Sequence, residues 1–427
     1  MTINIKTKNI LIIGFTISIL IRVYLILHSL DVADVSTMHK IANMLSEGKN
    51  PYINADFYVY PPLGVILQYA SLKIAYILKI GFHQVLRIWP SLADLFIGGL
   101  IYKFLIKKKI KPLKASLWTV FFVLNPISIM ISTLHGQLDS IPTLLILLSI
   151  YFMQFGIKTQ KLYLSSLLIG FAFAIKPNPI LLLPFLVFFN KLNRDRLKYL
   201  VISFIPLTLF LIPFLKNSYP TIISKLVSYS GVYDFGYAAI LRSLWYQHNA
   251  SYWLPFDIQF AQISKITFLI GYLFVVLALI KSKDLIKTSL TIFLLFYAFY
   301  FGVSAQYFIW ALPFAIIERD KITVPFTLFC TIALIGFYLF FSPSIILGSF
   351  ASIRAFQSEM ISIYFFGNLF LWLLVVYWFK AIITQNIRIY YLRYSLIQKY
   401  LLTVVALLFI ISIFPTIRLW LTIQGMS

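Results

Sequence analysis

Windows of about 20 mostly apolar residues, separated by short polar stretches, recur along the chain from residue 10 to residue 420. A transmembrane helix needs about 20 such residues to cross the hydrocarbon core of a bilayer. The pattern therefore predicts an all-α, polytopic transmembrane helical bundle of about 11–13 spanning helices. The predicted spans cover residues 10–28, 88–106, 115–133, 140–157, 162–175, 178–190, 199–215, 262–280, 288–303, 306–317, 322–341, 361–379 and 400–420.

Loops rich in Lys and Arg orient these spans, because such loops stay on the cytoplasmic side of a membrane. The loops predicted to be cytoplasmic are 103–114, 158–161, 191–198, 281–287, 318–321 and 380–399. One long apolar helix, Pro61–Ile80, is left out of the spanning set. Counting it would invert every later loop and would bury Lys73 in the membrane. We expect it to be a juxtamembrane helix in an outer loop, residues 31–87, of a single membrane domain covering residues 1–427.

Composition supports a lipid-dissolved chain. Of the 427 residues, 61% are apolar and 11% are charged, and the mean hydropathy is +0.90. No soluble core could bury so much apolar surface. The net charge of +23 resides in the short loops. It fits membrane topology and contact with lipid headgroups, so we expect no nucleic-acid partner.

Acidic residues are unevenly distributed in this topology, because eight of the thirteen fall on the outer side. Acidic residues contribute little to orientation, so the insertion rule does not explain this distribution. It indicates chemistry or ion binding at the outer face. The eight are Asp31, Asp34, Glu47, Asp56, Asp139, Asp234, Asp257 and Glu359.

The first outer loop follows Arg22, a charge within the first helix. Arg22 either extends its side chain to the outer interface or provides a fixed cation for a lipid phosphate or a nearby carboxylate. Asp31 and Asp34, three residues apart, share one face if the loop continues as a helix. Either one could instead be the N-cap of a helix over Val35–Leu45. GKNPY and YPP place a turn after that helix and prolines at the start of the next.

Two further outer segments carry polar side chains between apolar helices. In LHGQLDSIP, Asp139 could be a helix N-cap, but His135 and Gln137 beside it suit a polar ligand. KPNP would break a helix at the outer face and place Lys176 there, either extended to the interface or on a phosphate. In SAQYFIWALPF, Gln306 and Tyr307 fit either ligand binding or interface packing.

These segments together resemble a known family. Asp34 followed by a helix, GKNPY and YPPLG is similar to the first luminal loop of the GT-C glycosyltransferases related to the catalytic subunit of GPI mannosyltransferase I. The similarity continues through NPISIMISTLHGQLDSIPTLL, GFAFAIKPNPILLLPF and SAQYFIWALPF, in that order, over about residues 22–315. The resemblance implies a GT-C fold, a sugar donor on a polyprenyl or dolichyl phosphate, and inverting transfer at the outer or luminal face.

In that family the first loop carries an Asp-x-Asp pair. The resemblance puts Asp34 on the second aspartate, while Val32 replaces the first and Asp31 lies one residue away. This departure leaves open whether a divalent cation, Mn or Mg, is used. No P-loop, GxGxxG, GxSxG or HExxH motif is present.

The resulting hypothesis is a hexosyltransferase, mannose favoured, with Asp34 as general base and Asp31 behind it, acting on a glycan, glycolipid or protein acceptor. Burial is expected to raise the pKa of Asp34. The leaving phosphate needs only cations and hydrogen-bond donors. The rivals are a transporter or flippase for lipid-linked sugars and an oligosaccharide polymerase. The Ile, Lys and Asn bias favours a prokaryotic plasma membrane over the ER. The candidate substrate-binding residues are Arg22, His135, Gln137, Asp139, Lys176, Arg242, Gln306 and Tyr307.

Overall fold

The computed structural model describes residues 5–30, 32–55, 58–215, 218–228, 231–239, 254–347 and 357–390. Within these ranges the chain is helical, and its one β pairing is an isolated bridge between Phe235 and Val303. The predicted all-α class is therefore confirmed. The chain divides into two compact units, which are described separately because their relative placement is not determined. Unit 1 comprises Met1–Tyr229, Phe308–Asp320 and Ser342–Ile353, and unit 2 comprises Ser230–Tyr307, Lys321–Phe341 and Arg354–Ser427.

Six helices of the described ranges are long and apolar enough to cross a bilayer, and further apolar helices have 10–17 residues. These are the helices of an integral, multi-pass membrane protein. Each span predicted between residues 10 and 379 coincides with a helix or a run of helical turns. The span predicted over 400–420 lies outside the described residues. The six are Ile5–Leu27, Phe82–Lys107, Pro112–His135, Asn193–Phe214, Thr323–Phe341 and Met360–Gln385.

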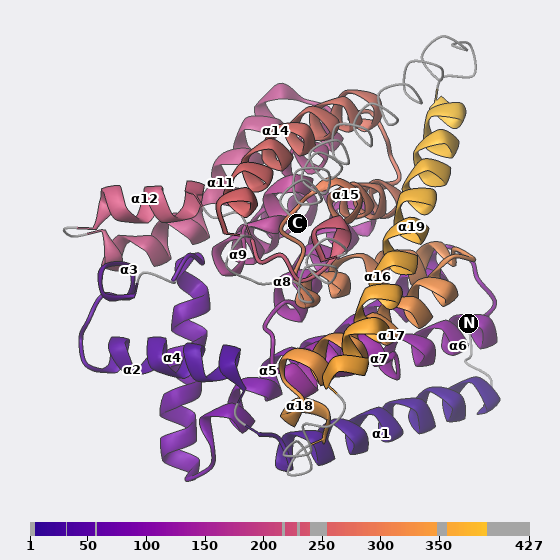
Figure 1. The fold of residues 1–427 in the computed structure, drawn as a ribbon. Helices are drawn as coiled ribbons and strands as arrows, with labels where there is room; N and C mark the ends of the chain where they lie inside the picture. Colours follow the sequence, from indigo (N-terminus) through magenta and orange to yellow (C-terminus); the bar gives the residue numbers. More distant parts are fainter. Residues whose placement is uncertain are drawn as a thin grey trace, which may run out of the picture. The chain divides into compact units, whose positions relative to one another are not determined.

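Unit 1 is a bundle in which α5 contacts α1, α6 and α8, and α9 packs between α8 and α11 (Figure 1). Helix α16 also belongs to this unit and packs against α5, α6 and α8. The elements of unit 1 are α1 (Ile5–Leu27), α2 (Ala33–Ser46), α3 (Pro51–Asn54), α4 (Pro62–Leu78), α5 (Phe82–Lys107), α6 (Pro112–Val123), α7 (Pro126–Ser128), η1 (Ile129–His135), α8 (Ser140–Phe155), η2 (Gln160–Leu164), α9 (Ser165–Ile175), η3 (Asn178–Leu182), α10 (Leu183–Phe189), α11 (Asn193–Leu211), η4 (Ile212–Phe214), α12 (Tyr219–Ser228), α16 (Phe308–Glu318) and α18 (Ser344–Leu347).

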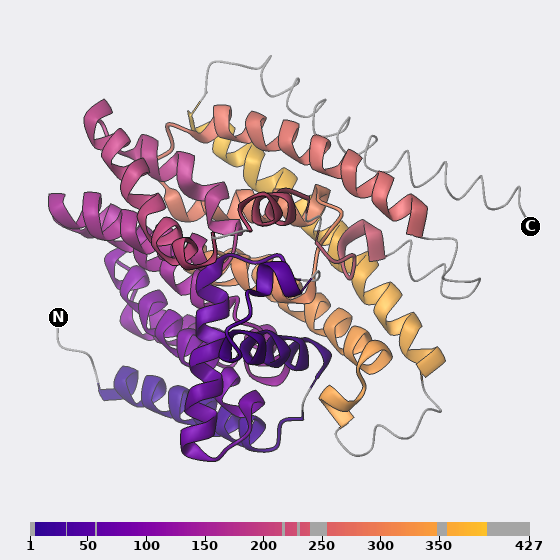
Figure 2. The same ribbon diagram turned by 90° about the vertical axis from the view of Figure 1, so that its left-hand side faces the viewer.

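The first outer loop folds as three helices: α2 and α4, which the sequence predicts, and the short α3 between them, which it does not. Helix α2 packs against α4, which in turn packs against α5 (Figures 1 and 2). Gly48 ends α2 with a positive φ of 74°, and the Asn50 side chain caps α3 by accepting a hydrogen bond from the Tyr52 amide. Pro61 and Pro62 begin α4. The turn and proline roles predicted for this loop are confirmed. Its placement at the membrane interface stays a prediction.

The span predicted over 115–133 is one continuous helix in the sequence pattern but three pieces in the structure. Helix α6 ends at Val123, and the Asn125 side chain caps a new start by accepting from the Ile127 amide. Pro126 at that start lacks the N–H that a continuous helix would need. The following segment, η1, is a π-helix that ends at Gly136. The His135 end of this segment lies against α2 of the first outer loop, where it contacts Asp34.

Unit 2 contains α14 (Leu254–Leu279), α15 (Leu285–Phe299), η6 (Ala305–Tyr307), α17 (Thr323–Phe341) and α19 (Gln357–Tyr390). Helices α17 and α19 make the most extensive contact. At Gly336 a side chain would lie 2.4 Å from the backbone nitrogen of Tyr364, so only glycine allows this approach. Helix α19 is continuous to Tyr390, with Ile382 and Ile383 buried. The predicted end of this helix at residue 379 is therefore wrong, because the helix continues beyond Lys380; the cytoplasmic location of the segment stays a prediction.

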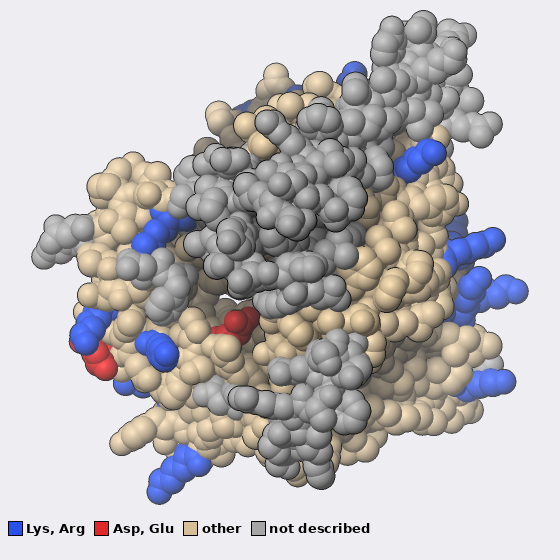
Figure 3. Space-filling view, viewed as in Figure 1, with Lys and Arg blue, Asp and Glu red and all other residues tan. Residues whose placement is uncertain are grey.

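Charged side chains are sparse on the face shown in Figure 3, where Lys and Arg lie as separate spots on a mostly uncharged surface. Many exposed side chains are large and apolar, as expected for a surface in contact with lipid. Because such a surface gives little support to buried charges, the charges inside unit 1 must pair within the protein.

Arg22 of α1 forms the most enclosed of these pairs. Its Nη1 lies 3.0 Å from Asp94 Oδ2 on α5, and both side chains are almost fully buried. The guanidinium also donates to Thr133 Oγ1 (2.7 Å), Ser128 Oγ (2.6 Å) and Ser18 Oγ (3.3 Å). Arg22 therefore does not extend its side chain to the surface. It is a fixed cation for a carboxylate, but that carboxylate is Asp94 on α5 and not an aspartate of the first outer loop. Arg22 joins α1, α5 and η1 at the centre of the unit.

We expect Asp94→Ala to destabilise the protein by about 3–5 kcal/mol, because it leaves the Arg22 guanidinium buried without its counter-ion. Thermal unfolding in detergent, followed by intrinsic fluorescence, measures the effect. The double variant Arg22→Met/Asp94→Ala should recover much of the lost stability. A double variant that is less stable than Asp94→Ala would contradict this account of the pair.

Candidate functional site

Asp34 lies in the first turn of α2, which begins at Ala33 after an N-cap position occupied by Val32. Val32 has no side-chain hydrogen bond to offer, and Asp34 does not cap the helix. The interpretation of Asp34 as a simple N-cap is therefore wrong. A carboxylate in the first turn interacts favourably with the positive end of the helix dipole. About half of the Asp34 side chain is exposed (51%), so it is accessible to a ligand.

Two side chains from the turn after η1 hold this carboxylate. His135 Nε2 lies 3.1 Å from Asp34 Oδ2, and Gln137 Nε2 donates to the same oxygen at 2.5 Å. Both are buried. Gly136 between them has a φ of +85°, which lets the chain reverse so that both neighbours face Asp34. The described residues give Oδ1 of Asp34 no hydrogen bond, so that oxygen is available to a substrate.

The pKa of Asp34 is lowered from its ordinary value of 3.8 by its surroundings. Burial alone would raise the pKa, but three partners outweigh it: the hydrogen bond and charge of His135, the charge of Lys176, and the hydrogen bond from Gln137. The expectation that burial leaves Asp34 with a raised pKa is wrong. Asp34 is ionised throughout the neutral range.

Lys176 lies where α9 ends at Ile175, so KPNP breaks a helix as predicted. The side chain is buried, with Nζ 3.2 Å from Asp139 Oδ2 and 4.0 Å from the centroid of the Tyr60 ring. Tyr60 follows the α3 segment, so the first outer loop forms one wall of the lysine site. Among the described residues Nζ donates no hydrogen bond with proper geometry. A buried ammonium that lacks hydrogen bonds is suited to an incoming anion.

Asp139 is fully buried and does not cap α8, although Ser140 begins that helix directly after it. Its Oδ1 accepts a hydrogen bond from Trp310 Nε1 of α16 at 3.0 Å, and its Oδ2 pairs with Lys176. Burial raises the pKa of Asp139, while Lys176 and Trp310 oppose that rise. The N-cap interpretation of Asp139 is wrong; it holds Lys176 in place.

The structure thus brings together five of the residues singled out from the sequence: Asp34, His135, Gln137, Asp139 and Lys176. Arg22 is elsewhere in the unit, within its pair with Asp94. Asp31 and Arg242 lie outside the described residues. Gln306 and Tyr307 belong to unit 2. There, Gln306 Oε1 accepts from Ser304 Oγ at 2.8 Å, and Ser304 Oγ also lies 3.2 Å from Asp234 Oδ2.

The sequence analysis did not single out Trp310, which contacts Asp139 of the site, or Asn178, a buried polar residue close to Lys176 in the sequence. In the sequence, Trp310 stands among apolar residues and looks like one more packing residue. A buried indole N–H, however, usually finds a hydrogen-bond acceptor. Asn178, two residues after Lys176, is buried with neither amide atom hydrogen-bonded among the described residues. Its position within KPNP was read only as part of a helix break.

The described residues contain no group of three or more His, Cys, Asp or Glu side chains that could hold a metal ion. Asp34 provides one oxygen without a hydrogen bond, and the neighbouring Asp31 is not described. A divalent cation therefore stays a prediction, and no step below depends on one.

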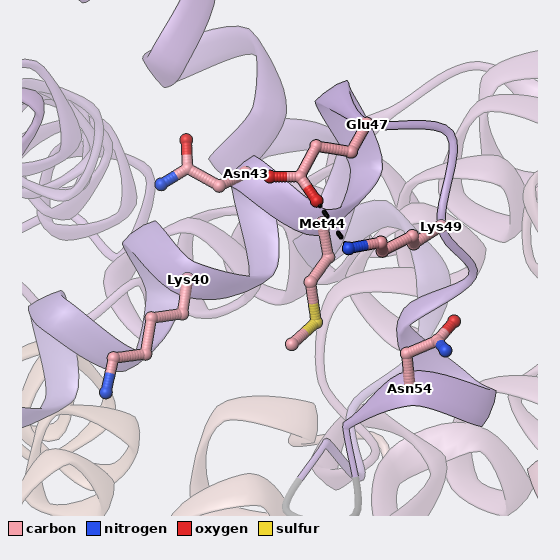
Figure 4. A pocket seen from close by; sticks show the side chains of 6 residues that line it. All are labelled: Lys40, Asn43, Met44, Glu47, Lys49 and Asn54. Carbon is pink, nitrogen blue, oxygen red and sulfur yellow. Dashed lines mark ion pairs between the residues drawn. The ribbon is translucent and has the colours of Figure 1, made fainter.

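A separate pocket of about 420 Å³ lies on the first outer loop, lined by both charged and amide side chains. Figure 4 shows Glu47 paired with Lys49 at its edge, where their charged atoms are 2.8 Å apart. Asn43 is nine residues from Asp34, which at about 100° per residue places it on the opposite side of α2. The pocket is therefore separate from the Asp34 carboxylate. Its lining residues are Lys40, Asn43, Met44, Glu47, Lys49 and Asn54.

Comparison with known proteins finds relatives for this arrangement. The family described as dolichyl-phosphate-mannose-protein mannosyltransferase matches residues 61–215, from α4 to η4. GPI mannosyltransferase 1 of Candida albicans is 27% identical over 331 residues, which cover 68% of this chain and 77% of the relative. The predicted resemblance is confirmed. GPI mannosyltransferase 1 of Schizosaccharomyces pombe is 30% identical over 148 residues, 34% of this chain and 36% of the relative.

The chain is thus similar to membrane mannosyltransferases of the GT-C type. The matched family region contains His135, Gln137, Asp139 and Lys176, while Asp34 precedes it. Both GPI mannosyltransferases named above come from yeasts. They lend no support to the prokaryotic plasma membrane favoured from composition, whereas the multi-pass membrane location stands.

The lowered pKa of Asp34 predicts how its contribution to stability depends on pH. A carboxylate with a lowered native pKa stabilises the fold above its unfolded pKa, and the contribution is lost only as the pH falls through the native value. The difference in melting temperature between the native protein and Asp34→Asn should therefore still be present at about pH 5 and should be lost only at lower pH. Thermal unfolding in detergent at neutral pH, at about pH 5 and below measures this difference. A difference already lost at about pH 5 would mean that the native pKa is not lowered.

Proposed function

We propose that this protein is a membrane glycosyltransferase that moves a mannosyl group from a polyprenyl- or dolichyl-phosphate donor to an acceptor hydroxyl. The transfer inverts the anomeric carbon and takes place at the outer or luminal face. The observation that carries the proposal is the combination of an ionised, half-exposed carboxylate, Asp34, with a buried ammonium, Lys176, that acts on it by charge and is held by Asp139. The names of the mannosyltransferases to which the chain is similar support the sugar.

Asp34 acts as general base in this proposal. The acceptor oxygen attacks the anomeric carbon, the bond from that carbon to the phosphate oxygen breaks, and the acceptor proton passes to Oδ1 of Asp34. The electron pair of the broken bond leaves with the phosphate. His135 and Gln137 bind Oδ2, so they fix the direction in which Oδ1 points.

The lowered pKa makes Asp34 a weak base, which suits this type of transfer. In glycosyl transfer the transition state resembles an oxocarbenium ion, and a carboxylate of ordinary strength can serve as the base. The acceptor hydroxyl becomes acidic only as its bond to carbon forms. The base must provide an oxygen that is ionised and held in a fixed position. The contacts to Oδ2 meet both requirements, because they favour the ionised carboxylate and fix its orientation.

Lys176 stabilises the leaving phosphate. A phosphate monoester or diester leaves as an anion and needs cationic and hydrogen-bonding groups rather than a proton. Asp139 offsets part of the lysine charge before the donor binds and keeps Nζ in place. His135 and Gln137 hydrogen-bond Asp34 in this proposal and do not bind the phosphate.

We expect Asp34→Asn to lower the transfer rate by about 100- to 10,000-fold, because an amide cannot accept the proton. The measurement is transfer of labelled mannose from a lipid-phosphate donor by membranes containing equal amounts of each variant. Asp195→Asn is the control, since Asp195 also lies in the first turn of a helix, α11, and the change is chemically the same. Near-normal transfer by Asp34→Asn would show that the base is assigned wrongly.

The donor class separates this proposal from its rivals. We expect product from polyprenyl-phosphate mannose and none from an oligosaccharide on a lipid diphosphate, because the described part of the site offers one ammonium, Lys176, to the leaving group. The assay offers both lipids, and polyprenyl-phosphate glucose and arabinose, to membranes with the native protein or Asp34→Asn. Product from the diphosphate alone would favour a polymerase. No product from any donor would favour a transporter or flippase.

A further inference from the structure

Arg87 of α5 is buried at the place where the two segments of the site meet, and the sequence analysis assigned it no role. It lies one and a half turns into the helix, on the face that contacts η1 and α2. Its guanidinium donates to three backbone carbonyls from three parts of the chain. These are His83 O on its own helix (3.0 Å), Leu30 O before α2 (2.9 Å) and Leu134 O at the end of η1 (3.2 Å).

The two distant carbonyls flank the site residues. Leu134 directly precedes His135, and Leu30 is four residues before Asp34. One rigid planar group therefore binds the segment that carries the base and the segment that carries its hydrogen-bond donors. A guanidinium can do this because its N–H groups form a fixed fork, whereas a lysine ammonium is a single point on a flexible stem.

The turn at Gly136 shows how closely these parts are fitted. A Cβ atom at Gly136 would lie 3.1 Å from Arg87 Cγ and 3.1 Å from Val35 Cγ2. Val35 is the residue after Asp34, so the turn touches both the arginine and the base-carrying helix. The positive φ of Gly136 would also strain any other residue.

Neighbouring residues of α5 hold the same segments. Gln84 Nε2 donates to Leu27 O at the end of α1 (3.3 Å), and Phe82 stacks on His39 of α2 with ring centroids 4.5 Å apart. The first two turns of α5 thus contact the end of α1, the side of α2 and the end of η1. Within this group, Arg87 is the residue that binds both segments leading into the site, at Leu30 and at Leu134.

We propose that Arg87 is a positioning residue for the reaction: it sets the Asp34 carboxylate against His135 and Gln137 and thereby aims Oδ1 at the acceptor. The proposal rests on the proposed function for its effect on rate. The geometric part, that Arg87 orders both segments together, stands on the contacts alone.

The test is Arg87→Lys, which keeps the charge but replaces three separate donor atoms, Nε, Nη1 and Nη2, by a single nitrogen that cannot occupy all three positions. We expect kcat to fall about 10- to 100-fold, because misplacement of a reacting group by about 1 Å has effects of that size. The KM for the lipid-phosphate donor should change less than about twofold, since Lys176 is not displaced. Arg196→Lys is the matched control: Arg196 also donates to a backbone carbonyl, that of Asn190 (2.8 Å), at the start of α11.

Two further measurements separate positioning from a general loss of structure. In the Asp34→Asn background, Arg87→Lys should cause no further loss of rate, because both changes act through the same carboxylate. Gly136→Ala should reproduce the fall in kcat with little change in KM. Additive losses in the double variant, or a KM that rises while kcat is kept, would overturn the assignment.

Hydrogen–deuterium exchange of the full-length protein in detergent tests the geometric part without any activity. Arg87→Lys should increase exchange in peptides covering residues 28–40 and 131–140 together, and leave those of α11 unchanged. If neither segment changes, the proposal for Arg87 is wrong, whatever the role of Asp34. If both change while Asp34→Asn retains full transfer, the proposed base is wrong and the ordering role of Arg87 stands.

Discussion

The hydrogen bonds from His135 and Gln137 to one oxygen of Asp34 are the interaction on which the rest of the site depends. They keep the carboxylate ionised against the burial that would otherwise raise its pKa, and they direct its second oxygen outward. They also require a sharp reversal at Gly136, which in turn requires that η1 end there and that α2 lie against the turn. The site is therefore a consequence of how two distant segments are packed.

Among the described residues of unit 1, buried charges are held by an opposite charge, as at Arg22, or by backbone carbonyls, as at Arg87, because neither lipid nor an apolar core compensates for them. Arg22 pairs with Asp94 and donates hydrogen bonds to neighbouring hydroxyl groups. Its charge is therefore neutralised and hydrogen-bonded by groups of the protein itself. Lys176 differs. It faces Asp139 and the ring of Tyr60 but makes no proper hydrogen bond among the described residues. That contrast distinguishes a structural charge from one that is suited to a ligand.

Much of the fold was predictable because the apolar windows, the prolines and the glycines each act locally. The helix after Asp34, the turn at Gly48, the start of α4 and the break after Ile175 all follow from residue type and spacing. The Asn-Pro pair at residues 125–126 can be recognised in the sequence. The sequence did not show that this pair divides the span predicted over residues 115–133 into separate helical segments. The length of α19 depends on side chains that pack beyond Lys380, such as Ile382 and Ile383. The polar residues in this part of the sequence gave no sign of that packing.

The sequence by itself determined that the chain is an all-helical membrane protein, and its ordered motifs determined which family it is similar to. Its residue types also marked Asp34, His135, Gln137, Asp139 and Lys176 as unusual between apolar helices. Only the tertiary structure decided their roles. His135 and Gln137 turned out to serve Asp34, Asp139 to hold Lys176, and Arg22 to neutralise Asp94. Partner choice depends on distances between residues up to about 170 positions apart, such as Asp139 and Trp310, and these distances are set by helix packing. For the same reason the direction of the pKa shift at Asp34, a sum of burial and nearby charge, could be obtained only from the fold.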